Sequence, residues 1–241
     1  MVSLANLLPP IQIKFDEPDL RKMAIGRRQL STEWTDVLRA PQGKSQDWCL
    51  ILPFPNTFQN AFETMSSVTV LAHVSKKNGN LCLFLKGIAA DEKPPQEIYD
   101  WITTIGKYVA MKDKLALSFA LDFERKGGDP KEPQSKVGAL RAIAKPYGRA
   151  TATKETTAAA DSLVERCIAF LKEMSCYESA DCVAAVPPSN PRKPYNLPHY
   201  LAEKIAAKWG RADLSEHVRT IKARGSIKST AVANKLDARA F

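Results

Sequence analysis

The chain has 241 residues, about the length that two modest domains use. It is 44% hydrophobic and 25% charged, a composition that excludes disordered, collagen-like and coiled-coil proteins. No apolar run approaches the roughly 18 residues of a membrane span, and the N-terminus lacks the basic region of a signal peptide. We therefore expect a two-domain cytoplasmic protein without a membrane segment.

The net charge of +9 is spread unevenly along the chain. Residues 181–241 hold 11 basic and 5 acidic side chains, and most of the remaining excess lies between Glu124 and Lys154. Such basic segments point to an anionic partner, either nucleic acid or the phosphate or pyrophosphate group of a nucleotide or other phosphorylated small molecule. The five cysteines are scattered and the three histidines stand far apart, so we expect reduced thiols and no protein-built metal site.

Residues 1–125 predict a β-rich α+β domain. Its expected elements are an extended segment at 11–15, a short helix at 30–38, and strands at 48–52, 68–74 and 81–88. Asn78-Gly79 lies between the last two strands and is a strong hairpin signal. A helix at 96–111 and an alternating strand at 115–123 complete the domain.

Aromatic residues in this first domain have a spacing typical of a core or of an interface, and the sequence does not separate the two. They are Trp48, Phe54, Phe58 and Phe62. We expect the domain to dock a protein partner or to build one face of an oligomer, with the turn from Phe54 to Phe58 as the candidate contact.

The clearest break in the chain runs from Glu124 to Lys136 and contains Gly127-Gly128. We place a linker at 126–136 and a second, α/β domain at 137–241. Its expected elements are helices at 137–144 and 156–174, a strand at 181–186, a proline-rich loop at 187–194, and a helix at 197–209 that Gly210 ends.

The proline-rich loop is the candidate site. In open α/β sheets ligands bind beyond the carboxyl ends of the strands, and this loop follows a strand and leads into a helix. Main-chain N–H groups at the helix start, with Arg192 and Lys193, favour phosphate or pyrophosphate. The alternative is an ordinary solvent-exposed loop. His199 lies near the helix start, where we expect a surface residue without a catalytic role.

The segment from Asp181 to Trp209 resembles the type I phosphoribosyltransferases, and their ComF-like branch in particular. It reads as an acid, an apolar strand, Val-Pro-Pro-Ser, an arginine, and a helix with Leu-Ala-x-x-Ile-Ala. The basic stretch through Val218-Arg219-Thr220-Ile221 and Ser226-Ile227-Lys228-Ser229 to the terminal Ala-Phe is similar to the same branch. The resemblance covers about residues 137–241.

This resemblance implies a parallel sheet flanked by helices and a glycosyltransferase that acts on phosphoribosyl pyrophosphate with Mg²⁺. The loop after the strand would bind the pyrophosphate, and a flexible basic segment would cover the reacting centre. The implied pyrophosphate-binding residues are Pro187, Pro188, Ser189, Asn190, Arg192, Lys193 and Lys228.

One family motif is missing. In the family, a strand ending in two acids and followed by Thr/Ser-Gly-Thr/Ser binds the ribose hydroxyls and the 5′-phosphate. Asp16-Glu17 and Asp91-Glu92 lack the glycine turn, and the chain ends at Phe241, where that strand would begin. Three explanations stay open: the sequence is an N-terminal portion of a longer protein, a partner supplies the rest, or the domain is a degenerate relative. The domain is catalytic only if the missing motif is supplied elsewhere.

The alternative function is a non-catalytic nucleic-acid-binding or scaffold subunit of a DNA-processing or defence complex. Tyr147, Tyr195 and Tyr200 lie among the basic segments and are available to stack on bases, whereas Trp209 falls on an apolar helix face. No hydrolase or nucleotide-loop motif occurs.

Overall fold

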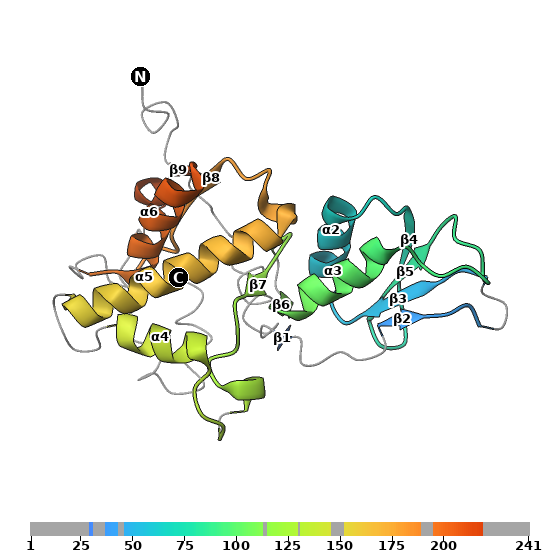
Figure 1. Cartoon of the computed structure of the whole chain (residues 1–241), viewed down its shortest axis with the longest axis horizontal. Helices are drawn as coiled ribbons and strands as arrows, with labels where there is room; N and C mark the ends of the chain where they lie inside the picture. The colour runs from blue at the N-terminus through green and yellow to red at the C-terminus, as the bar shows by residue number, and fades with distance from the viewer. Residues whose placement is uncertain are drawn as a thin grey trace. The chain divides into compact units, whose positions relative to one another are not determined.

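A computed structural model of the chain describes residues 29–30, 37–42, 46–112, 115–129, 131–145, 152–188 and 195–218. The protein is mixed α/β, with antiparallel and parallel sheets (Figure 1). It divides into two compact units. We call them the sheet unit, with the described residues of 28–132 and 171–178, and the crossover unit, with those of 133–170 and 179–218. The extended segment expected at 11–15 lies outside the described residues.

The sheet unit is built on four antiparallel strands in the order β2-β3-β5-β4. The strands are β2 (Leu38–Arg39), β3 (Cys49–Leu52), β4 (Val70–Val74) and β5 (Leu81–Leu85). The predicted hairpin between β4 and β5 is confirmed. Its turn is closed by Ser75 N–H donating to Asn80 O at 2.8 Å, and Gly79 has a φ of 71°, which favours glycine.

One face of this sheet carries the core of the unit. Leu81, Leu83 and Leu85 of β5 are fully buried, while the alternating residues between them are half-buried. Two helices supply the other side of the core, α2 (Pro55–Met65) and α3 (Gln96–Gly106), with the Phe62 and Trp101 rings 5.1 Å apart. Each buried leucine stabilises the fold by roughly 1.5–3 kcal/mol relative to an exposed one.

The prediction that Phe54 to Phe58 form an exposed turn that contacts a partner is wrong. Pro55 begins helix α2 there, because proline at the first helical position already has the required φ and needs no hydrogen-bond donor. Phe54 and Phe58 are 6% and 0% exposed, and their rings stack with centroids 6.0 Å apart. These side chains therefore belong to the core and are not available to a partner.

Three further elements of the sheet unit differ from prediction. A helix was expected at 30–38, but Leu30 belongs to strand β1 (Gln29–Leu30) and Leu38 to strand β2. Residues 31–36 lie outside the described part. The helix expected at 96–111 ends at Gly106, because the next residues form β6 (Val109–Lys112) between β1 and β7 (Phe119–Ala120). Of the strand expected at 115–123, only β7 enters the ladder.

The crossover unit contains α4 (Lys136–Ala144), α6 (Leu197–Trp209) and most of α5 (Lys154–Glu173), so the three predicted helices are confirmed. Small residues of α4 and α5 pack against the start of α6; the cluster is Ala144, Ala159, Ala160, Leu163 and Leu197. Among the described helices, none combines the length and the apolar character needed to cross a membrane.

Two short parallel strands complete this unit, β8 (Cys182–Val183) and β9 (Ala212–Asp213). The predicted strand at 181–186 is thus present but shorter, and β9 was not predicted. Gly210 ends α6 as predicted, with a left-handed φ of 70° and its N–H donated to Ala206 O. In chain order, β8 is followed by residues 184–196, α6 and then β9, which pairs with β8.

The five cysteines are free thiols. Burial is the main reason that the pKa of Cys49 rises to about 12 and those of Cys167 and Cys176 to about 11. These three thiols are therefore protonated at neutral pH. Among the described residues, no group of three His, Cys, Asp or Glu side chains is arranged to hold a metal ion.

Candidate functional site

The candidate site lies at the carboxyl edge of the crossover unit. Cys182 pairs with Ala212 and Val183 with Asp213 in parallel register, so both strands end at the same edge. Leu214 N–H donates to Val183 O at 2.8 Å, which is the last main-chain bond between them. In α/β proteins, ligands bind at this edge, beyond the carboxyl ends of the parallel strands.

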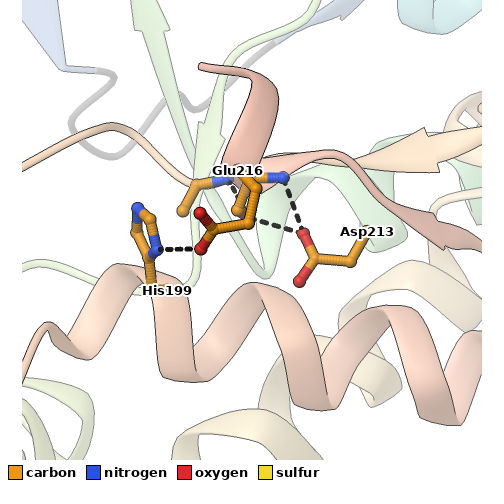
Figure 2. Close-up of polar contacts among 5 residues, drawn as sticks. His199, Asp213 and Glu216 are labelled. Atoms are coloured by element: carbon orange, nitrogen blue, oxygen red, sulfur yellow. Dashed lines mark hydrogen bonds and ion pairs between the residues drawn. The ribbon is translucent and has the colours of Figure 1, made fainter. Parts of the chain in front are cut away.

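A buried serine extends the pairing beyond the strands. Ser215, in the short 3₁₀ turn Ser215–His217, is 3% exposed. Its hydroxyl accepts from Ala185 N–H at 2.9 Å and donates to Asp213 Oδ1 at 2.5 Å, and its own N–H donates to the same oxygen at 2.9 Å (Figure 2). This serine fixes the course of the chain as it leaves β8.

Ser215→Ala should therefore lower the free energy of unfolding by about 1–3 kcal/mol, because it leaves the buried Ala185 N–H without its acceptor. Chemical denaturation of the full chain measures the change. Ser162→Ala is the matched control, since that exposed hydroxyl only bonds Ala158 O within α5, and we expect less than about 0.5 kcal/mol. Equal effects of the two substitutions would contradict the bracing role of Ser215.

His199 stands on the first turn of α6 and faces Glu216. Its Nδ1 lies 3.9 Å from Glu216 Oε1, too far for a hydrogen bond but close enough for an ion pair when the ring is protonated (Figure 2). The histidine side chain is 30% exposed and the glutamate 85%. The expected surface histidine is therefore half-buried, with one ring nitrogen toward a carboxylate.

Buried polar atoms without partners gather at the start of α6. In the described part of the chain, four buried side-chain atoms make no hydrogen bond, and three of them are Tyr195 Oη, Asn196 Nδ2 and His199 Nε2. The fourth, Trp101 Nε1, lies in the sheet unit. Buried polar groups in native proteins are nearly always paired, so three unpartnered atoms within five residues make this segment the candidate binding position.

The main chain adds donors at the same place. Asn196 is the N-cap of α6, yet its side chain makes no capping hydrogen bond. The N–H groups of Leu197 and His199 have no acceptor within the helix because they belong to its first turn, and Pro198 between them has no N–H. The helix dipole makes this end partly positive, which favours an anion.

A tyrosine pair connects this segment to α5. Tyr200 Oη donates to Asp161 Oδ1 at 2.6 Å, and this bond, with burial, raises the pKa of Tyr200 to about 12. Burial and the nearby Asp161 also raise the pKa of Tyr195. The two rings lie 6.3 Å apart, and both phenols stay protonated at neutral pH.

Only part of the predicted pyrophosphate site falls in the described chain. Pro187 and Pro188 are half-buried and follow β8, and Val186 before them is 76% exposed. Ser189, Asn190, Arg192, Lys193 and Lys228 lie outside the described residues, as does Tyr147. Asn196, Ser215 and Glu216 were not predicted as site residues; the Asp-x-Ser turn at 213–215 was a local signal for the last two.

No protein-family model, curated protein or solved structure matches the chain.

Proposed function

We propose that the crossover unit binds the pyrophosphate group of phosphoribosyl pyrophosphate or of a nucleotide at the carboxyl edge of β8, as a phosphoribosyltransferase-like protein. The observation that carries the proposal is the group of buried, unpartnered atoms at Tyr195, Asn196 and His199. They lie between a strand end and a helix start, which is where crossover folds bind phosphates.

The chemistry of these atoms fits an anion. An amide Nδ2 is a donor only, a tyrosine hydroxyl can donate, and a histidine ring nitrogen donates when protonated. Pyrophosphate oxygens offer acceptors to all three groups and to the main-chain N–H groups of Leu197 and His199. Arg192 and Lys193 immediately precede this segment and would add charge-assisted hydrogen bonds.

Carboxylates at the same edge favour a metal-bound form of the ligand. Glu216 is exposed and lies beside His199. Asp213, three residues earlier in the chain, accepts hydrogen bonds from Ser215 through its Oδ1. These negative charges oppose a bare anion but are matched by a pyrophosphate that carries Mg²⁺, which is usually bound by one or two carboxylates together with phosphates and water. The exposed Glu216 is the carboxylate that fits this role.

The reaction that such a site serves is displacement at the anomeric carbon of the ribose. The bond from that carbon to the pyrophosphate breaks, pyrophosphate leaves with the electron pair, and a nitrogen nucleophile forms the new bond and loses a proton. Charge stabilisation of the leaving group is the contribution expected from this edge. Catalysis in addition needs a ribose-phosphate motif, which the sequence of this chain lacks.

The test is isothermal titration of the full chain with pyrophosphate and Mg²⁺. Asn196→Ala should weaken binding about tenfold, the effect of losing one hydrogen bond to a charged group. Glu203→Gln, an exposed change farther along α6, is the control and should leave the affinity unchanged. Three results would count against this site: Asn196→Ala binds as tightly as the wild type, both variants lose affinity, or the wild-type chain binds no pyrophosphate.

A further inference from the structure

Among the described residues, β4 is the longer of the two edge strands of the four-stranded sheet. In the order β2-β3-β5-β4, strand β4 stands at the end of the sheet and pairs only with β5 among the described residues. The strand at the opposite end, β2, is only two residues long and carries Arg39. Short length and charge are the usual protections of an edge strand against pairing with another chain.

The hydrogen bonds of the hairpin show which groups of β4 face outward. Lys86 N–H donates to Thr69 O at 2.9 Å, and Ser75 N–H donates to Asn80 O at 2.8 Å. Because antiparallel bonds alternate along a strand, the intervening odd-numbered residues also bond to β5. The N–H and C=O groups of Val70, Ala72 and Val74 therefore point away from the sheet.

This edge lacks protection. The segment Val70–Val74 reads Val-Leu-Ala-His-Val, with no lysine, acid or proline. Leu71 is 57% exposed and Val74 is 45% exposed. An uncharged edge of this length presents main-chain donors and acceptors ready for another strand.

The edge is complementary to itself. In an antiparallel pairing with a two-fold axis at Ala72, each Ala72 faces the other, and Val70 faces Val74 of the second copy. Every outward N–H then meets an outward C=O, giving about six main-chain hydrogen bonds. On the uncovered face, Leu71 stands opposite His73 of the second copy. A two-fold contact of this kind is closed and yields a dimer.

Charges next to the strand fit the same register. The pairing that joins the two Ala72 residues brings the end of β4, where the turn with Lys77 begins, beside the start of β4 in the second copy, which follows Ser67. Ser67 N–H and its hydroxyl both donate to the carboxylate of Glu97, and bonds from Ser66 and Ser67 lower the pKa of that acid, so it is ionised at neutral pH. Lys77 is exposed in the β4–β5 turn, and the structure gives it no ion pair among the described residues. Each copy thus offers a lysine to the glutamate of the other.

We infer that β4 is the dimer interface of this protein, where two copies join their sheets by antiparallel pairing centred on Ala72 and by the contact of Lys77 with Glu97 of the second copy. All residues of this interface belong to the sheet unit, whereas those of the proposed pyrophosphate site belong to the crossover unit. It also replaces the turn from Phe54 to Phe58 as the candidate oligomer contact.

Sedimentation of the full chain over a range of micromolar concentrations tests the inference. The expected result is a concentration-dependent dimer. Ala72→Pro removes an outward donor without touching the bonds to β5, and Lys77→Glu reverses the charge; each should raise the dissociation constant at least about tenfold. Ile143→Lys, on an exposed apolar residue of α4, is the matched control and should leave it unchanged.

Hydrogen exchange gives a second readout that does not depend on a variant. Exchange of the Val70, Ala72 and Val74 amides should slow as the concentration rises, whereas the amides that bond β5 should be protected throughout. A chain that sediments as a monomer at every concentration overturns the inference. A dimer that neither Ala72→Pro nor Lys77→Glu weakens, or whose three outward amides stay unprotected, overturns it as well.

Discussion

Arg192→Ala combined with Lys193→Ala is expected to lower the affinity for magnesium pyrophosphate at least about 100-fold, because each side chain contributes about 1.5–3 kcal/mol as a charged hydrogen-bond donor. Both residues precede the unpartnered atoms at Tyr195 and Asn196 by only a few positions. They are the nearest cations in the sequence to the start of α6. Titration calorimetry of the wild type and of the double variant with magnesium pyrophosphate measures the change in affinity.

A control has to separate local contact from net charge. Arg166→Ala with Lys172→Ala removes the same two charges from exposed positions on α5 and should change the affinity less than about twofold. The salt dependence gives a second check, since the affinity of the double loop variant should fall less steeply with added salt than that of the wild type. Equal losses in both double variants would mean that general basicity, and not this loop, attracts the anion.

Phe58→Ala should lower the free energy of unfolding by about 3–5 kcal/mol. The ring is fully buried, stacks on Phe54, and meets the edge of the Phe119 ring with centroids 6.5 Å apart. Truncation removes these contacts and leaves a cavity between α2 and β7 that well-packed neighbours cannot fill. Denaturant unfolding of the full chain measures the loss.

Leu115→Ala serves as the comparison, because Leu115 is 61% exposed and should change the stability by less than about 0.5 kcal/mol. If Phe58→Ala proved as mild as this surface change, the assignment of α2 to the core would be wrong. Such a result would support the sequence-based prediction that residues Phe54 to Phe58 lie at the surface and contact a partner.

Local signals in the sequence were sufficient for several elements. The β4–β5 hairpin follows from Asn78-Gly79 between apolar runs, and Gly79 adopts the positive φ that this turn requires. Helix α6 follows from its apolar spacing and from Gly210, whose left-handed conformation ends it. In both cases a residue with an unusual backbone preference marks the boundary.

Other elements depend on partners distant in the chain. Val109 continues the apolar periodicity of α3, yet it enters β6 because β1 and β7 offer main-chain pairing on both sides. Helix α2 was missed because its aromatic residues also suit a turn, although Pro55 at its first position signals a helix start. Pairing and burial, which no local pattern contains, decided both outcomes.

The candidate site divides in the same way. The proline-rich loop after β8 and its cations Arg192 and Lys193 stay a prediction, because residues 189–194 lie outside the described part of the chain. The hydrogen bonds that join Ala185, Ser215 and Asp213 could not be predicted, because one hydroxyl links residues about 30 positions apart in the chain. The orphaned atoms at the start of α6 are visible only once burial and hydrogen-bond partners are known.

The most direct test of the central claim is a titration of the isotope-labelled chain with pyrophosphate and Mg²⁺, followed by the NMR shifts of its backbone amides and of the Asn196 side-chain amide. The account predicts that the largest shifts fall on residues 184–199 and include Asn196 Nδ2. Saturable shifts elsewhere, or none in this segment when the chain is folded, would contradict a pyrophosphate site at the carboxyl edge of β8.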